Sequence, residues 1–266
     1  APPELRQREQ ALLDVADVVF TGGPSLYDAK RQRHKNVLCL PSAVDARPYS
    51  RQRALADGDG MRRADELQGA ITSPRLGFFG VIDERLDLAL IEALAAADPA
   101  WQLIMVGPVV KISPEDLPRS PNIHWLGQQS YEHLPHLVSG WDVCLLPFAL
   151  NESTRFISPT KTLEYMAAEK PVVSTPVRDV AVLYGQDVRI ADSHEAFVSA
   201  CRDLLAETAE DRLRRMAQMA ATVASYSWDN TAETIRAAIE RAVGEHHRTQ
   251  GTQAQSGKGT LSAVGA

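Results

Sequence analysis

The chain has 266 residues, of which 44% are hydrophobic and 23% are charged, and its formal net charge is −6. This composition is typical of a globular protein with one large core or two smaller ones, and it argues against a disordered chain. The negative charge also argues against nucleic acid as the main partner, because binding to a phosphate backbone usually requires a basic surface.

The three cysteines, Cys39, Cys144 and Cys201, are far apart, which fits neither a disulfide framework nor a metal-ligand spacing. We therefore expect a cytoplasmic protein with reduced thiols. The longest apolar run, residues 143–150, is well short of the ~20 residues that a membrane helix needs. The opening stretch APPELRQREQ lacks the apolar core of a signal peptide and has no initiator methionine, so we expect the chain to begin inside a longer protein.

Short apolar runs predict strands, in chain order, at residues 17–21, 36–40, 75–81, 101–106, 122–126, 142–147, 171–175 and 188–190. Apolar residues at helical spacing predict helices at residues 86–97, 131–139, 159–168, 194–207, 211–225 and 230–243. Strands that alternate with helices predict an α/β protein, with a Rossmann-like parallel sheet covered by helices on both faces and a helical C-terminal end.

Composition changes divide the chain. Residues 49–72 are rich in Arg, Asp, Gly and Gln and are predicted to be a linker with room for a short helix. Residues 246–266 are rich in Gly, Ser, Thr and Gln and are predicted to be a flexible tail, of a kind that can tether a further domain.

The segment SPTKTLEYM carries the main candidate site. Ser158 followed by Pro159 suits the N-cap and first position of a helix, whose free N–H groups and positive dipole end favour an anion. Lys161 lies in the first turn, where acidic residues are preferred, so something negative must offset its charge. A bound phosphate would do so.

Glu164 lies three residues after Lys161, on roughly the same helix face, where its carboxylate could accept two hydroxyl groups. Together the two side chains suit a nucleoside diphosphate, with Lys161 at the phosphates and Glu164 at the ribose. A simple surface salt bridge between them is the alternative. The position of the segment after the strand DVCLLPF favours the ligand site, since ligands collect at the carboxyl ends of parallel strands.

These residues resemble a known family. DVCLLPF, the following loop and SPTKTLEYMAAEKPVVST are similar to the donor-nucleotide segment of retaining GT-B glycosyltransferases, family-four-like, in the branch of bacterial cell-surface polysaccharide enzymes. The resemblance extends to VADVVFTGGPSLYD, VLCLPSAVD, LGFFGVID, WQLIMVGP and SWDNTAETIRAAIERAV. It implies that residues 73–227 are the donor-binding domain, that residues 1–48 are only the last strands of an acceptor domain, and that residues 228–245 are the helix that crosses back to it.

The resemblance also implies residue roles. Phosphate contacts fall on Lys161, Ser158, Thr160, Gly80 and Arg85, and the ribose contact falls on Glu164. The donor sugar would lie at Asn151 and Thr154, and Gly107 and Gly127 would line the nucleotide cleft. Each glycine has a structural alternative, a turn that needs positive φ. For Arg85 the alternative is a solvated arginine at a helix start.

The sequence departs from the family pattern at two places. Many relatives carry a second glutamate where this chain has Phe156, although Glu152 lies nearby. Relatives also often place an Arg and a Lys after the glycine of the first donor-domain strand, whereas GVIDERLD leaves only Arg85. Catalytic residues are therefore not assigned.

No metal site is predicted. His133 and His136 share a predicted helix and His124 a strand, but no carboxylate or cysteine joins them at ligand spacing. The acidic residues Asp83, Glu84 and Asp87 are better explained as a helix-start preference.

We therefore expect a glycosyltransferase, or its donor-binding half, that moves a hexose from a UDP- or GDP-linked sugar to a bacterial glycan or lipid-linked acceptor without a cofactor or divalent ion. Such acceptors also allow peripheral contact with the inner face of the membrane. A nucleotide-sugar epimerase and a non-catalytic binding or scaffold domain are the alternatives.

Overall fold

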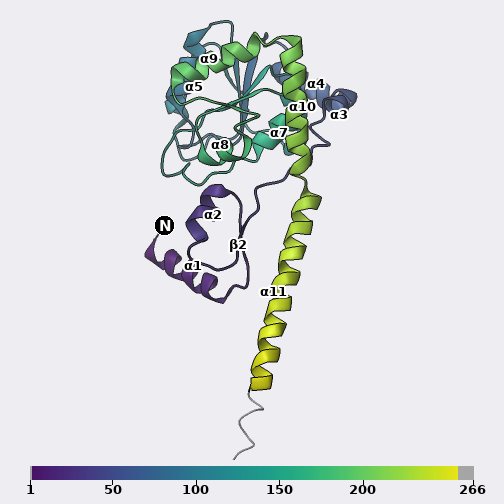
Figure 1. The fold of residues 1–266 in the computed structure, drawn as a ribbon. Coiled ribbons are helices and arrows are strands. Elements are labelled where there is room, and N and C mark those ends of the chain that lie inside the picture. The colour runs from purple at the N-terminus through teal and green to yellow at the C-terminus, as the bar shows by residue number, and fades with distance from the viewer. Residues whose placement is uncertain (1, 257–266) are drawn as a thin grey trace, which may run out of the picture.

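The computed structural model describes residues 2–256. Its centre is a six-stranded parallel sheet with the strand order β5-β4-β3-β6-β7-β8 (Figure 1). All eight predicted strands are present, and these six are β3 (Arg75–Phe79), β4 (Gln102–Val106), β5 (Ile123–Trp125), β6 (Val143–Leu146), β7 (Val172–Ser174) and β8 (Arg189–Ile190).

Helices cover both faces of this sheet, as predicted. On one face α5 (Leu88–Ala97) contacts α9 (His194–Leu205), and on the other α7 (Lys161–Ala167) contacts α10 (Ala209–Ser225) (Figure 1). Every residue of β6 and β7 is buried, which explains why these strands are continuous apolar runs rather than alternating ones. The remaining helical elements of this part are α6 (Leu134–Ser139), α8 (Arg178–Tyr184) and the short 3₁₀ turns η1 (Pro114–Asp116) and η2 (Tyr131–His133).

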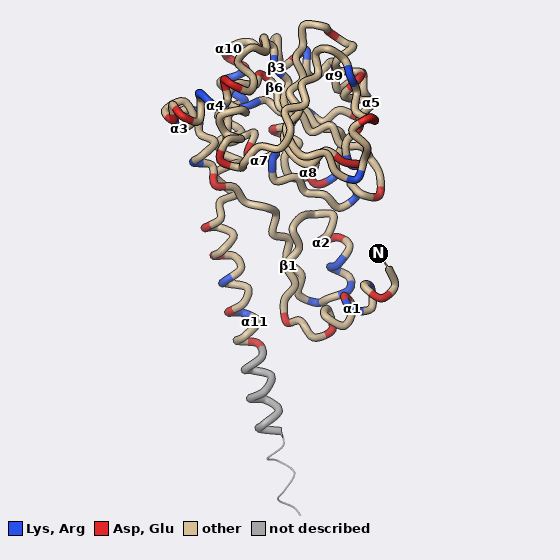
Figure 2. Tube along the Cα trace, turned by 180° about the vertical axis from the view of Figure 1, so that it is seen from behind, with Lys and Arg blue, Asp and Glu red and all other residues tan. Residues whose placement is uncertain are grey.

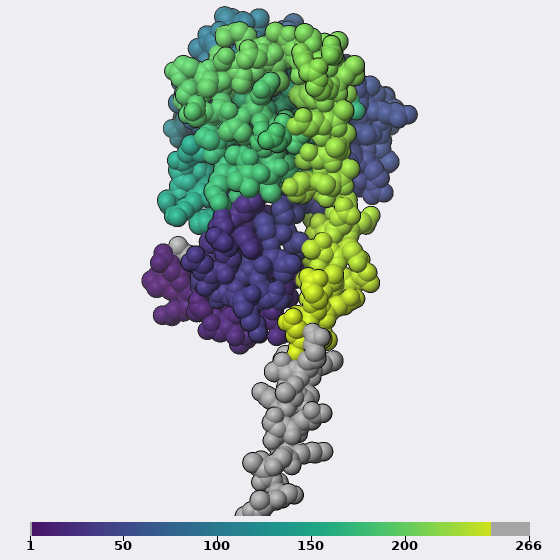
Figure 3. All heavy atoms as spheres, viewed as in Figure 1, coloured from purple at the N-terminus to yellow at the C-terminus, as the bar shows by residue number. Residues whose placement is uncertain are grey.

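The beginning of the chain forms a smaller unit. It consists of α1 (Pro3–Val15), β1 (Val19–Thr21), α2 (Pro24–Lys30) and β2 (Val37–Cys39), and its two strands form a parallel sheet of their own. The helix α11 (Trp228–Ser256) leaves the large sheet domain and runs alongside this unit, as views from opposite sides show (Figures 1 and 2). In space-filling form the small unit packs directly beneath the large domain (Figure 3).

Residues 49–72 were predicted to be a linker between domains, and this prediction is wrong because the segment is packed against the large domain. The segment forms two helices, α3 (Arg51–Ala56) and α4 (Gly58–Gln68), that both contact α6. Gln68 is buried, donates to the carbonyl of Leu137 over 2.9 Å and accepts from the Trp141 indole over 3.0 Å. These contacts make the segment part of the large domain.

The predicted boundary of the C-terminal tail is also wrong. Helix α11 continues to Ser256 rather than ending near Val243, so only residues 257–266 of the predicted tail remain, and these lie outside the described residues. Across residues 2–256, no helix combines the length and the apolar character that spanning a membrane requires.

Candidate functional site

Three loops meet at the carboxyl edge of the large sheet. The loop after β3 is held on one side by the loop after β4, because the Ile82 amide donates to the Pro108 carbonyl over 2.9 Å. On its other side the Ala149 amide, after β6, donates to the Arg85 carbonyl over 2.9 Å. The backbone at this edge is therefore fixed before any ligand arrives, which is what a preorganised site requires.

The glycines at this edge have distinct roles. Gly80, Gly107 and Gly127 all have positive φ, at 144°, 147° and 66°. A Cβ on Gly107 would stand 1.8 Å from the Gly80 carbonyl oxygen, so Gly107 is needed for the packing of the two loops. A Cβ on Gly80 would stand 2.9 Å from Cε of Lys161, so Gly80 makes room for that side chain.

Lys161 lies at the wall of a cavity of about 280 Å³ with Arg85, Val81, Phe148 and residues 157–160. Its ammonium stands over two aromatic rings, 5.5 Å from the centroid of Phe78 and 5.4 Å from that of Phe148. Burial lowers its pKa to about 8. Within the described residues it has no hydrogen bond or ion pair, and the alternative of a salt bridge with Glu164 is not realised.

The start of this helix differs from the prediction. Helix α7 begins at Lys161, and Thr160 occupies the N-cap position with helical φ and ψ and no side-chain cap, so Ser158 is not the N-cap. The amides of Thr162 and Leu163 donate within the turn, to the carbonyls of Pro159 and Thr160. Ser158, Pro159 and Thr160 nevertheless line the cavity, so the segment opens into it as expected.

Glu164 is buried at 7% exposure and accepts a hydrogen bond from the Tyr131 hydroxyl over 2.7 Å. Burial and this carboxylate raise the pKa of Tyr131 to about 12. The Tyr131 ring stands edge-on to Tyr49, with 6.2 Å between centroids. The Tyr49 hydroxyl is buried without a hydrogen-bond partner, and burial followed by the charge of Glu164 raises its pKa.

Sequence reasoning missed these aromatic neighbours. Tyr49 and Tyr131 precede Glu164 by over a hundred and by 33 residues, and no local pattern links them. Phe78 and Phe148 had a usable signal, because Phe78 lies near the end of β3 and Phe148 lies two residues after β6, and these parallel strands are neighbours. Parallel strands bring such ends together at one edge.

Arg85 lines the same cavity but has a protein partner. Its guanidinium donates to both carboxylate oxygens of Asp83 over 2.7–3.0 Å. Burial raises the pKa of Asp83, but the hydrogen bonds from Arg85 outweigh it, so that the pKa is lowered. Asp83 is 1% exposed, and it therefore holds Arg85 at the cavity as a positioned cation rather than a solvated one.

Asn151 and Thr154 hold their own loop together. The Asn151 side chain donates to the Glu84 carbonyl over 3.0 Å and accepts from the Thr154 amide. The buried Thr154 hydroxyl donates to the Asn151 carbonyl over 3.0 Å. Phe156, in contrast, is 41% exposed, and Glu152 lies within 3.7 Å of Arg155. The loop is thus well defined, and its side-chain hydrogen bonds are made internally.

The histidines have structural partners. His124 contacts Gln102 over 2.8 Å, His133 contacts Ser130 over 2.8 Å, and His136 pairs with Asp57 over 3.0 Å. Among the residues that the structure describes, no three His, Cys, Asp or Glu side chains gather as a metal site would require.

Sequence comparison identifies the family. The family model of glycosyl transferases group 1 matches residues 73–207, which is half of the chain and the part that contains the large sheet. The chain therefore belongs to the glycosyl transferases group 1 family, and its architecture is that of GT-B glycosyltransferases.

One curated relative is the putative teichuronic acid biosynthesis glycosyltransferase TuaH of Bacillus subtilis (strain 168), 29% identical over 147 residues, which are 53% of this chain and 37% of TuaH. Among solved structures, sucrose-phosphate synthase of Thermosynechococcus elongatus superposes with a TM-score of 0.71 at 19% identity over 91% of this chain and 62% of that one. Anabaena HepE in complex with UDP and glucose gives 0.68 at 16% identity over 89% and 66%. The chain thus spans less than two thirds of each of these proteins.

Proposed function

We propose that this chain is the donor-binding part of a glycosyltransferase that transfers a hexose from a nucleoside diphosphate-sugar to a glycan or lipid-linked acceptor. The observation that carries the proposal is the Lys161 ammonium, which lines a cavity without a protein counter-ion. An ammonium held this way is costly, because desolvation is not repaid by an opposite charge. A diphosphate in the cavity would supply that charge.

The chemistry follows from the charges at this wall. When the bond to the sugar breaks, negative charge grows on the departing diphosphate, and Lys161 and the positioned Arg85 lie where they would stabilise it. Lys161 provides the charge that no ion pair balances, and the Arg85 guanidinium, whose charge Asp83 balances, adds N–H donors, so this stabilisation needs no divalent ion. Residues 157–160 line the same cavity, and the amides of Ser158 and Thr160, which make no hydrogen bond within the described residues, would add donors to the phosphate oxygens.

The ribose would be held by Glu164. Tyr131 donates to Oε1 of this carboxylate, while no hydrogen bond within the described residues uses Oε2. A carboxylate oxygen can accept more than one hydrogen bond, so a ribose diol can bind beside Tyr131 or replace it. Tyr131 is 57% exposed and is free to turn toward solvent when the nucleoside enters.

The relatives support the substrate class. HepE is described in complex with UDP and glucose, and TuaH is named for teichuronic acid biosynthesis. We propose on this basis a UDP- or GDP-linked hexose, a polysaccharide-type acceptor, retention of configuration, and a cytoplasmic location that allows contact with the inner face of the membrane. Acceptor residues would come from protein beyond this chain, because the chain covers only part of each relative.

Thermal unfolding with UDP and GDP tests the proposal. At a ligand concentration 100-fold above Kd, one nucleotide should stabilise the chain by about 2.7 kcal/mol, which corresponds to a Tm increase of about 5–10 °C. Lys161→Ala and Glu164→Ala should each weaken binding at least about 10-fold. Lys35→Ala removes the same charge from an exposed position on the small unit and serves as the control. Equal stabilisation of all four proteins would reject the site.

A further inference from the structure

A second cavity, also about 280 Å³, lies at the opposite edge of the large sheet. Gly140, Trp141 and Asp142, directly before β6, form part of its wall, and Lys170 and Pro171, directly before β7, form another part. The cavity lined by Lys161, Arg85 and residues 157–160, which we call the donor cavity, lies at the carboxyl ends of these strands, so the sheet separates the two cavities. Nothing in the proposed donor chemistry uses this second cavity.

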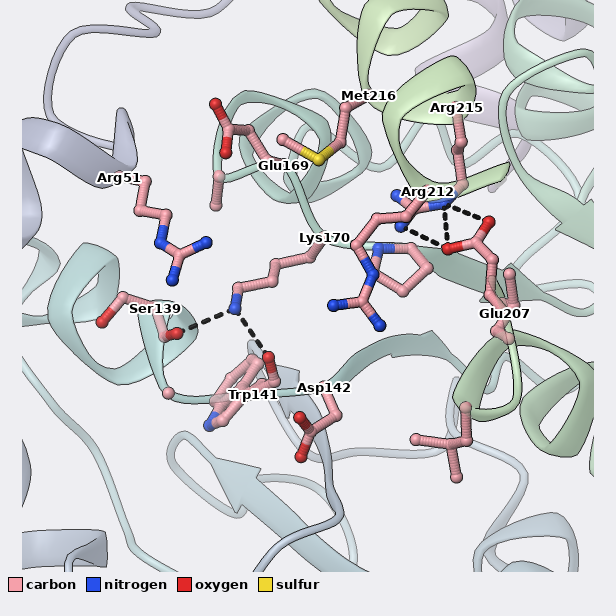
Figure 4. A pocket seen from close by; sticks show the side chains of 15 residues that line it. Arg51, Ser139, Trp141, Asp142, Glu169, Lys170, Glu207, Arg212, Arg215 and Met216 are labelled. Carbon is pink, nitrogen blue, oxygen red and sulfur yellow. Dashed lines mark hydrogen bonds and ion pairs between the residues drawn. The ribbon is translucent and has the colours of Figure 1, made fainter. Parts of the chain in front are cut away.

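Cationic side chains from three different segments line it. Arg51 is the first residue of α3, Lys170 precedes β7, and Arg212 and Arg215 lie on α10 (Figure 4). Arg215 is neutralised within the protein, because it pairs with Glu207 over 2.9 Å and both side chains are nearly buried, at 13% and 10% exposure. The other three cations define what we call the cationic cavity.

Lys170 is held in place without being neutralised. Its ammonium donates to the carbonyls of Ser139 and Trp141 over 2.8 and 2.7 Å, and Ser139 ends α6. Two neutral acceptors leave the third N–H of the ammonium unused and its full charge in place. Burial lowers its pKa, and the charges of Asp142 and Glu169 act against this shift without forming an ion pair with Lys170 within the described residues.

Arg51 and Arg212 have no side-chain hydrogen bond or ion pair within the described residues, and Figure 4 shows their guanidinium groups directed toward the space beside Lys170. The cavity also contains two unpaired carboxylates. One oxygen of Asp142 accepts from the Arg75 amide over 2.7 Å, and Glu169 points away from the Lys170 ammonium in Figure 4. Three cations against two carboxylates leave an excess of positive charge directed inward.

We propose that the cationic cavity binds a phosphate group, at a site separate from the donor nucleotide. Two guanidinium groups provide forked pairs of N–H donors that match phosphate oxygens, and the lysine adds a compact charge between them. The volume of about 280 Å³ accommodates a phosphate, either as a free anion or as the headgroup of an anionic phospholipid. The donors come from three segments that only the folded domain brings together, so the site exists only in the native state.

Calorimetric titration with inorganic phosphate, at constant ionic strength with chloride, tests the proposal on the whole chain. We expect saturable binding that Arg51→Gln and Arg212→Gln each weaken about 10-fold or more. Arg214→Gln is the matched control, because Arg214 lies on the same helix but forms surface ion pairs with Glu210 and Asp211. Lys170 is left unchanged, since it also holds the end of α6.

Two further experiments distinguish the cationic cavity from the donor cavity and identify the source of the phosphate. Lys161→Ala should lose at most the phosphate bound beside Lys161 and should keep the binding that Arg51→Gln and Arg212→Gln weaken, whereas complete loss of phosphate binding in this variant would show that only the donor cavity is occupied and would overturn the proposal. Sedimentation with vesicles of phosphatidylglycerol in phosphatidylcholine, against phosphatidylcholine alone, identifies the source. Vesicle binding that depends on Arg51 and Arg212, without binding of free phosphate, assigns the phosphate to a lipid headgroup. If the chain binds neither free phosphate nor vesicles, the cationic cavity is rejected as a site. It is also rejected if Arg214→Gln weakens binding as much as Arg51→Gln and Arg212→Gln do.

Discussion

Burying the charged Lys161 side chain lowers the free energy of unfolding of the ligand-free protein. Its pKa, near 10.5 in an unfolded chain, is lowered to about 8 because folding buries the ammonium between aromatic rings. A shift of this size means that keeping the buried group charged at pH 7 costs on the order of 3 kcal/mol of folding free energy. The cost is tolerable only if the charge is needed for a ligand, as is common at functional sites.

Replacing Lys161 by methionine, which is unbranched and one atom shorter, should therefore stabilise the free protein at pH 7, by about 1–3 kcal/mol. The size of this difference depends on pH. Between about pH 8 and 10.5 the unfolded chain holds a proton that the folded chain has lost, so the unaltered protein gains stability as the pH rises and the difference shrinks.

Urea unfolding of both proteins at pH 7 and pH 10 measures this difference. Because other groups titrate equally in the two proteins, only the comparison between them is informative. A methionine variant that is less stable than the parent at pH 7 would mean that the ammonium is already stabilised by the protein, which would remove the main argument for an anion in the donor cavity.

At the scale of elements, the loops after β3 and β4 contact each other closely because glycine leaves no Cβ between their backbones. The carbonyl of Gly80 lies where a Cβ of Gly107 would stand, and the Gly107 amide itself donates to the Gly127 carbonyl over 2.8 Å. A side chain at position 107 would push the two loops apart and displace the wall against which Lys161 packs.

Gly107→Ala should destabilise the chain by at least about 2 kcal/mol, since it adds unfavourable φ to a backbone clash. Gly22→Ala is a suitable comparison, because a Cβ there meets no atom within 4 Å and its φ is not positive. Chemical denaturation of the two variants measures the difference. Similar stabilities would show that the loops separate easily and that the edge is not preorganised.

The central strands were predictable from the sequence because both faces of the large sheet are covered, so most residues of these strands are apolar and buried. Helices α3 and α4 also had signals, since Ser50 and Asp57 cap them by accepting from the amides of Arg53 and Gly60. Their polar composition suggested a linker instead. Lys161 and Glu164 were selected from the sequence, and their roles as ligand contacts stay a prediction. The Tyr131 hydrogen bond to Glu164 could not be predicted, because it joins positions that only the tertiary fold brings together.

At the scale of the whole molecule, a buried carboxylate helps to join the small unit to the large domain. Asp179, on α8, is 1% exposed and accepts from the Ser25 amide over 2.8 Å at the start of α2. Its second oxygen is buried without a hydrogen bond, beside Gly23 and near Ser158. A buried carboxylate with one unsatisfied oxygen makes this contact depend on close packing around Gly23.

Asp179→Ala should loosen the small unit while leaving the large sheet intact. Hydrogen exchange should become faster in residues 16–40 and stay unchanged in β3, β4 and β6, because these strands do not touch the contact. Asp28→Ala removes the ion pair between Asp28 and Arg178, whose side chains are 40% and 51% exposed, and should have little effect. Faster exchange throughout the sheet would show that the two parts unfold together.

The placement of α7 has a consequence for the two cavities. Lys161 opens this helix in the donor cavity, and the residues that follow its end, Ala168, Glu169 and Lys170, enter the cationic cavity. Residues 162–166 of this helix are all buried in the core, so the helix is packed along its length between the two cavities. A phosphate on the far side of the sheet and the sugar donor would thus bind at opposite ends of one short, buried helix.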